Sequence, residues 1–451
     1  MSPLDQSAAL PATNGPALRL LQRVVAVRPE EVGAVCWCWL YIFAVLSAYY
    51  IMRPIRDQMG VAGGVNNLPW LFTGTLAGMV LLNLPFAYLV KKLPRSRFVP
   101  LTYRFFAFNI LLFAVALGFA GAAQEVWIGR IFFIWVSVYN LFVVSVFWQL
   151  NVDLFTPEQG KRLFGFIAAG ATIGALFGSL IVTTLARDVS PTLLLIGAAL
   201  LLEVAVFSVG RLARLSPSLH RRPGDADAAK ADERPVGGSV LAGVIHAFRS
   251  PYLLSVGAFL LLYAVTSTFA YFAQADIVSH AFSDRRAQTQ FFGSIDSGVN
   301  ALALLLQLFF TGRIIILLGV SLALALLPAL TMLGFAALAI TPSLGVIAAF
   351  QIMRRAADYA ITRPAREVVY TVVPREDRYK TKGFIDTFVY RLGDQAAAWS
   401  VPLLTGPGSR AAPFAAIAVA ALWLVNALWL GRRQKAMEGE GASPSTAGSA
   451  M

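Results

Sequence analysis

Long apolar stretches separated by short polar connections run along almost the whole chain. A membrane-spanning helix needs about 20 predominantly apolar residues, and twelve stretches reach that length. They cover residues 32–52, 67–90, 98–121, 131–150, 163–185, 192–210, 251–275, 291–311, 317–340, 343–362, 383–405 and 412–431. The pattern predicts an all-α polytopic membrane protein with about twelve transmembrane helices.

The composition supports this prediction, because 57% of the 451 residues are hydrophobic and only 14% are charged. Soluble domains carry roughly 25% charged residues. The first 31 residues are polar or mixed, and the apolar stretch that follows is long enough to remain as an anchor. We therefore expect no cleaved signal peptide. Cys36 and Cys38 lie inside that first span, where they form neither a disulfide framework nor a complete metal site.

The basic residues are distributed unevenly between the two sides of the predicted membrane. If the N-terminus is cytoplasmic, the cytoplasmic loops and tails hold 26 of the 37 Lys and Arg residues, the opposite loops hold 7 and the spans hold 4. Retention of Lys and Arg on the cytoplasmic side predicts this asymmetry. We expect an inner-membrane protein with both termini cytoplasmic. The net charge of +13 then requires no nucleic-acid partner.

The longest connection, residues 211–250, divides the spans into six-helix halves at 32–210 and 251–431. We expect a flexible linker there that ends in a short amphipathic helix over 240–248. Residues 1–31 and 432–451 are predicted to be a cytoplasmic N-tail and a disordered C-tail.

Segments 157–167 and 374–385 both place Pro, a charged turn and Gly-Phe-Ile before a span, which indicates an internal repeat. Two such halves predict a major facilitator-like architecture, with a substrate site between them and transport by alternating access.

A charge inside a span costs about 2.5–3.5 kcal/mol on insertion scales, so each one is a functional candidate. Arg53 and Arg56 end the first span on one helical face, next to Asp57. Pro54 is expected to kink or end this helix. Two guanidiniums at a helix end suit an anionic ligand. The alternative is an interfacial patch of arginines beside a tyrosine belt.

Span ten carries Gln351, Arg354, Arg355 and Asp358 at the spacing of one helical stripe. Two arginines cannot be neutralised by one aspartate, so an anion or another acid must complete the set. A structural network between helices is the alternative interpretation.

Span eleven carries Asp386, Arg391 and Asp394, and local pairing of Arg391 with Asp394 explains that cluster equally well. Arg104 and Asp296 are single charges in their spans. Each of them either binds substrate or locks the two halves together.

Other features favour structure over chemistry. Gly170, Gly174 and Gly178 recur every fourth residue, a spacing that lets helix backbones approach closely. For Glu203 we favour a satisfied polar contact over a proton site. The three histidines fall in predicted loops and no phosphate-binding G-x-x-x-x-G-K-[ST] loop occurs. We expect no enzyme activity, no cofactor and no metal.

Three stretches resemble segments of the ATP/ADP translocase (nucleotide transporter) family of plastids and intracellular bacteria. They are 51–60, then 147–151 with 160–174, and 380–386 with 391–394. The resemblance implies exchange of nucleotides across a membrane. Arg56 stands where the family has Lys, and Asp57 matches. Asp394 replaces a family Lys, which should weaken polyphosphate binding.

We predict a membrane transporter that moves an anionic, nucleotide or phosphorylated solute by alternating access. The residues expected to contact the substrate are Tyr50, Arg53, Arg56, Arg104, Trp148, Gln149, Arg354, Arg355 and Arg391. The residues expected to gate the site or to couple transport to an ion are Asp57, Asp296, Asp358, Asp386 and Asp394. The expected partners are the small-molecule anion and the bilayer, and we expect a monomer. A proton-coupled carrier of another solute and a transport-inactive scaffold are the rival hypotheses.

Overall fold

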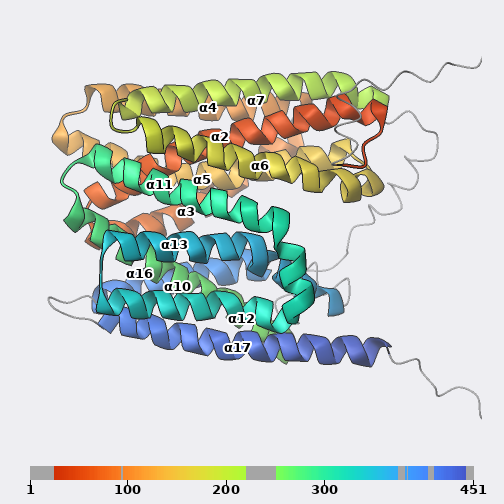
Figure 1. Ribbon diagram of the computed structural model, residues 1–451. Helices are drawn as coiled ribbons and strands as arrows, with labels where there is room; N and C mark the ends of the chain where they lie inside the picture. Colours follow the sequence, from red (N-terminus) through yellow and green to blue (C-terminus); the bar gives the residue numbers. More distant parts are fainter. Residues whose placement is uncertain are drawn as a thin grey trace, which may run out of the picture.

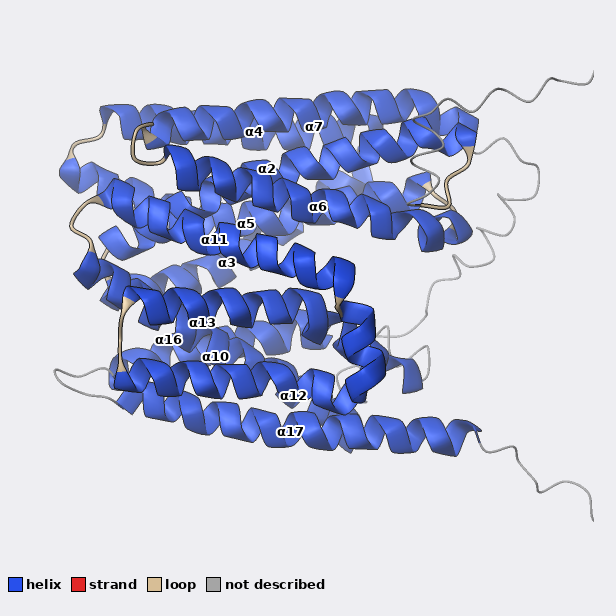
Figure 2. Cartoon of the chain, viewed as in Figure 1, coloured by secondary structure: helices blue, strands red, loops and turns tan. Residues whose placement is uncertain are grey.

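The computed structural model describes residues 25–92, 95–219, 250–373, 381–382, 384–404 and 411–442. Long helices run side by side across the molecule, and no strand occurs in these residues (Figure 2). The all-α prediction is confirmed.

The helices form two halves, drawn red to yellow-green and green to blue in Figure 1. The first half contains η1 (Pro29–Glu31), α2 (Val32–Ala62), η2 (Val65–Asn67), α3 (Leu68–Lys92), α4 (Arg95–Phe119), α5 (Ala122–Leu154), α6 (Pro157–Leu185) and α7 (Pro191–Leu219). The second contains α10 (Pro251–Ala281), α11 (Arg285–Phe309), α12 (Thr311–Ile340), α13 (Leu344–Ala357), η3 (Asp358–Thr362), α14 (Arg363–Val369), η4 (Tyr370–Val372), η5 (Ile385–Val389), α16 (Tyr390–Leu404) and α17 (Ala411–Ala442). Helix α11 packs against α2 and α6 and so joins the halves.

Ten helices in the described part of the chain are long and apolar enough to cross a membrane. The two predicted spans outside this set are 343–362 and 383–405. Each has a π-helical segment, η3 or η5, near one of its ends, which leaves α13 with 14 residues and α16 with 15. Such segments are frequent at functional sites.

Several predicted boundaries were wrong because hydropathy marks only the apolar part of a helix. Pro54 does not end the first helix, and α2 continues to Ala62. Helix α7 continues into the predicted linker and α17 into the predicted C-tail, to Leu219 and Ala442. The predicted amphipathic helix at 240–248 lies outside the described residues, as do the repeat segment 374–380, residues 1–24 and residues 443–451.

The glycines of α6 allow it to touch the backbone of α2. A Cβ atom at Gly174 would overlap the carbonyl oxygen of Phe43, and one at Gly178 would overlap that of Ser47. The Ser47 hydroxyl also donates a hydrogen bond of 3.0 Å to the Gly174 carbonyl. The predicted packing role of these glycines is confirmed, and it fixes the position of α2.

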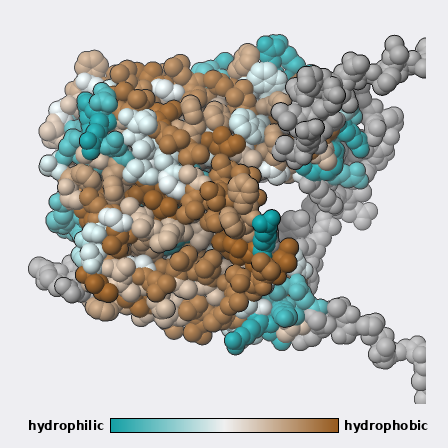
Figure 3. Space-filling model, in the orientation of Figure 1, coloured by the Kyte–Doolittle hydropathy of each residue, from teal (hydrophilic) through white to brown (hydrophobic). Residues whose placement is uncertain are grey.

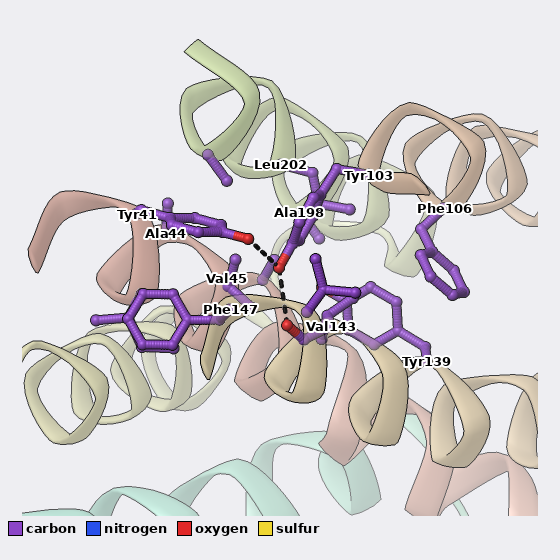
Figure 4. Close-up of a cluster of buried hydrophobic side chains, with 14 of the residues drawn as sticks. Tyr41, Ala44, Val45, Tyr103, Phe106, Tyr139, Val143, Phe147, Ala198 and Leu202 are labelled. Atoms are coloured by element: carbon purple, nitrogen blue, oxygen red, sulfur yellow. Dashed lines mark hydrogen bonds between the residues drawn. The ribbon is translucent and has the colours of Figure 1, made fainter. Parts of the chain in front are cut away.

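A buried tyrosine chain holds α2 from its other side (Figure 4). The Tyr41 hydroxyl of α2 donates to the Tyr103 hydroxyl of α4 at 2.6 Å, and Tyr103 donates to the Val143 carbonyl of α5 at 2.8 Å. Both tyrosines are fully buried. Buried hydroxyl groups without partners are unfavourable, so this chain favours one arrangement of the three helices.

Replacing Gly178 with Ala should destabilise the protein by about 1–3 kcal/mol, because the new methyl group must push α2 away from α6. Gly197 in α7 is the matched control, since a Cβ there meets nothing within 4 Å. Thermal unfolding in detergent should show a clear drop for Gly178→Ala and little change for Gly197→Ala. Equal midpoints would contradict the close-packing account.

Candidate functional site

A polar cavity of about 300 Å³ lies between the two halves. This volume is at the lower end of the range of about 300–1,000 Å³ that is typical of small-molecule sites. Of the described residues that line it, six are arginines and two are carboxylates: Arg53, Arg56, Arg354, Arg355, Arg363 and Arg391, with Asp57 and Asp394. The surface is recessed between the halves at the end of the bundle where α2 begins (Figure 3).

Contacts between the halves close the opposite end of the bundle. Glu125 at the start of α5 forms an ion pair with Arg285 at the start of α11. The Gln290 amide donates to the Thr183 carbonyl at 2.9 Å, near the end of α6. The structure is therefore closed at one end and recessed at the other.

Asp296 of α11 joins the halves beside the cavity. Its Oδ1 atom accepts hydrogen bonds from Arg53 of α2 at 2.7 Å and from Arg355 of α13 at 2.8 Å. The carboxylate is 2% exposed, and its Oδ2 atom has no hydrogen-bond partner within the described residues. One aspartate is thus the shared counter-charge of two arginines from different halves.

Arg56 and Asp57 form a second charged group on α2. The Arg56 Nε atom donates to Asp57 Oδ1 at 2.9 Å, and the Tyr271 hydroxyl of α10 donates to the same oxygen at 3.2 Å. The Arg56 guanidinium also lies 4.9 Å from the centre of the Phe133 ring, a cation–π contact. These side chains face the interior of the bundle rather than a bilayer surface.

Arg354 has no carboxylate partner among the described residues. It is 5% exposed and donates to the Ser267 hydroxyl at 2.8 Å and to the Gln351 side-chain oxygen at 3.4 Å. Its Nε atom has no hydrogen-bond partner there. A buried charge without a counter-charge is strongly unfavourable unless a ligand or another charge neutralises it.

The remaining arginines are paired. Arg363 donates to Asp358 at 3.0 Å and Arg391 donates to Asp394 at 3.1 Å. Six arginines therefore share four carboxylates (Asp57, Asp296, Asp358 and Asp394), which leaves two positive charges in excess. In the described part of the chain, no group of three or more His, Cys, Asp or Glu side chains is placed to hold a metal ion.

Seven of the predicted site residues do not line this cavity. Asp296 and Asp358 lie behind it, where they accept hydrogen bonds from the cavity arginines Arg53, Arg355 and Arg363. Tyr50 is buried beneath Arg53, and Trp148 packs against Phe147 and Phe164. Gln149 is exposed, and Asp386 lies 3.9 Å from Arg366. Arg104 is on the outer surface of the bundle, 3.8 Å from Glu203.

Several polar residues of the cavity wall were not predicted from the sequence because they are uncharged. Tyr263, Ser267, Tyr271 and Gln274 all line it from α10, and their spacing follows one face of a helix. That stripe was present in the sequence. Arg363 was missed as a site residue because it falls just beyond the predicted end of span ten.

No protein-family model and no curated protein matches the sequence. Solved structures of transporters match it over nearly its whole length. A bacterial homologue of the human lysosomal transporter Spinster, inward-facing, has a TM-score of 0.55 at 12% identity, over 93% of this chain and 100% of that one. The peptide transporter POT in complex with sulfate has 0.55 at 13%, over 90% and 94%. The nucleoside transporter NupG has 0.54 at 14%, over 91% and 99%.

These likenesses show the fold, which is that of the major facilitator transporters. The predicted fold class is thereby confirmed. The resemblance to ATP/ADP translocases receives no support from the comparisons.

Asp296→Asn should lower the free energy of unfolding by about 3 kcal/mol or more, because it leaves two buried arginines without their shared carboxylate. Asp386→Asn is the control, since its contact with Arg366 is long and more exposed, and it should cost about 1 kcal/mol or less. Unfolding midpoints of the two purified variants would show the difference. A loss for Asp296→Asn no larger than for Asp386→Asn would contradict its role as a shared counter-charge.

Proposed function

We propose that this protein is a membrane transporter that carries a small anionic solute by alternating access, with the solute bound in the arginine-lined cavity. The observation that carries the proposal is the excess of two positive charges at the cavity, including the unpaired Arg354.

An anion in the cavity would complete the charge balance. Guanidinium groups bind carboxylates and phosphates through paired hydrogen bonds, and such charge-assisted bonds are roughly twice as strong as neutral ones. Attraction between charges is also stronger in a site shielded from water than in bulk solvent. Arg354 has an unpaired Nε atom and lines the cavity, so it is the first contact we assign to the anion.

The closed end and the recessed end support alternating access. By the predicted topology, the recessed end faces the cytoplasm, and the described conformation is then inward-facing. Rocking of the halves would break the contacts at the Glu125–Arg285 end and open the cavity to the other side.

Within the anion class, a nucleotide or another organic phosphate is the finer candidate. Tyr263, Tyr271, Tyr359 and Tyr390 give the cavity an aromatic wall that suits a ring-bearing solute. Asp394 occupies a position where the ATP/ADP translocase family, which the sequence resembles, has Lys. It is paired with Arg391, and its negative charge would lower the affinity of the cavity for a polyanion.

Proton-coupled transport of another solute is the second candidate. Asp57 and Asp394 both line the cavity, and a carboxylate that gains and loses a proton as the halves move is a suitable coupling group.

Arg354→Gln should reduce uptake of the anion by about tenfold or more, because it removes the unpaired cation while keeping a hydrogen-bonding side chain. Arg104→Gln is the matched control: it removes another arginine of a predicted span, but one that lies outside the cavity. Uptake into proteoliposomes should fall only for Arg354→Gln. Normal uptake by a folded Arg354→Gln protein would contradict the assignment.

Substrate class and coupling can be tested together in proteoliposomes that contain phosphate, AMP, ADP or nothing, with labelled AMP or ATP outside. Uptake that depends on an internal anion would support anion exchange. Uptake driven by a pH gradient into empty vesicles would instead favour the proton-coupled candidate. Absence of flux for every anion offered would favour the scaffold hypothesis and contradict the proposed function.

A further inference from the structure

Arg104 and Glu203 lie on the outer face of the first half, where α4 packs against α7 at the edge of the bundle farthest from the second half (Figure 1). We propose that this face binds a second copy of the same chain within the membrane. The inference is independent of the proposed function, because neither residue lines the cavity.

Glu203 is placed at the middle of a span. It is twelve residues from each end of the apolar segment Pro191–Leu215, which corresponds to about 18 Å of helix on either side. Its side chain is 50% exposed, and that of Arg104 is 64% exposed. Both charges therefore lie on a surface that the hydrocarbon core of the bilayer would otherwise cover.

Ionisable side chains inside membranes almost always face the bundle interior or a water-filled cavity. This pair does neither. The distance between its charged atoms is 3.8 Å, and no hydrogen bond to either side chain is found within the described residues. The pair is thus poorly satisfied by its own chain. Lipid headgroups do not reach the middle of a bilayer, so we assign the occupant of this face to protein rather than lipid.

The charges identify a second copy as the partner. An acid and a base side by side are complementary to the same pair rotated by a twofold axis, so that each Arg104 meets the Glu203 of the other copy. Large exposed apolar side chains surround the pair: Leu101, Phe105 and Phe108 on α4, with Leu200 and Phe207 on α7. Such side chains supply the apolar contact that a helix–helix interface needs. The proposal predicts a twofold dimer, whereas the sequence led us to expect a monomer.

The proposal is tested by energy transfer between two differently labelled populations reconstituted at low protein density in phosphatidylcholine liposomes. Arg104→Glu places two acids on the face, and Glu203→Arg places two bases there. Because like charges repel across an interface, each single variant should associate about tenfold more weakly than the wild type or worse. A mixture of the two single variants should regain energy transfer, since acids then meet bases. The double variant Arg104→Glu/Glu203→Arg should also regain it.

Cysteine crosslinking gives a test that leaves the charges unchanged. In a background with Cys36 and Cys38 replaced by Ala, Phe108→Cys should crosslink to itself through a short bismaleimide. Leu422→Cys, on a lipid-facing position of α17 at the other edge of the bundle, should not. Three results would overturn the proposal: a wild type that shows no energy transfer at any protein density, equal crosslinking at both positions, or crosslinking of Phe108→Cys in native membranes only to a different polypeptide.

Discussion

Six guanidinium groups meet at the centre of a protein that is otherwise built for a hydrocarbon environment, and their neutralisation constrains the arrangement of the helices around them. Among the described residues, four carboxylates pair with these six groups, and one of them, Asp296, is shared between Arg53 and Arg355. Arg354 lies beside them, and its hydrogen-bond partners in the part of the chain that the structure describes are neutral. A buried charge can be tolerated only if it is paired or if a ligand completes the pairing. In the proposed function, the same constraint that organises the cavity also selects an anion as its ligand.

Helix α2 connects this electrostatic arrangement to the fold. It carries Arg53, Arg56 and Asp57, and it is held on one side by glycine contacts with α6 and on the other by the tyrosine chain to α4 and α5. Because α2 is fixed within its half, a change in the pairing at Asp296 cannot be absorbed by a movement of α2 alone. Such a change in pairing must instead alter the position of the first half relative to α11 and α13. In the proposed mechanism, an anion that changes this pairing would thereby change the relative position of the halves.

The architecture was largely predictable because each membrane span appears in the sequence as a continuous apolar stretch. The distribution of Lys and Arg added an independent expectation for the orientation of the chain in the membrane. The charges inside spans also pointed correctly to most of the arginines that line the cavity. Three features were not accessible in this way. Hydropathy could not say that Arg104 points outward while Arg354 points inward, since both are charges in predicted spans and an apolar window carries no information on the direction of a side chain. It ended α7 and α17 too early because their last turns are polar. It also overlooked the tyrosines of α10, which carry no charge but supply much of the cavity wall.

The most direct test compares the binding of AMP, inorganic phosphate and uncharged adenosine to the purified protein by calorimetry, with all three ligands at the same low ionic strength and again after salt has been added. If the excess positive charge determines the ligand, at least one of the two anions should bind with measurable affinity, and added salt should weaken that binding. The affinity for adenosine should be lower by about tenfold or more, since only a charged ligand neutralises the excess arginines. Adenosine binding as tight as AMP binding, with no response to either phosphate or salt, would contradict the claim that the excess positive charge of the cavity determines its ligand.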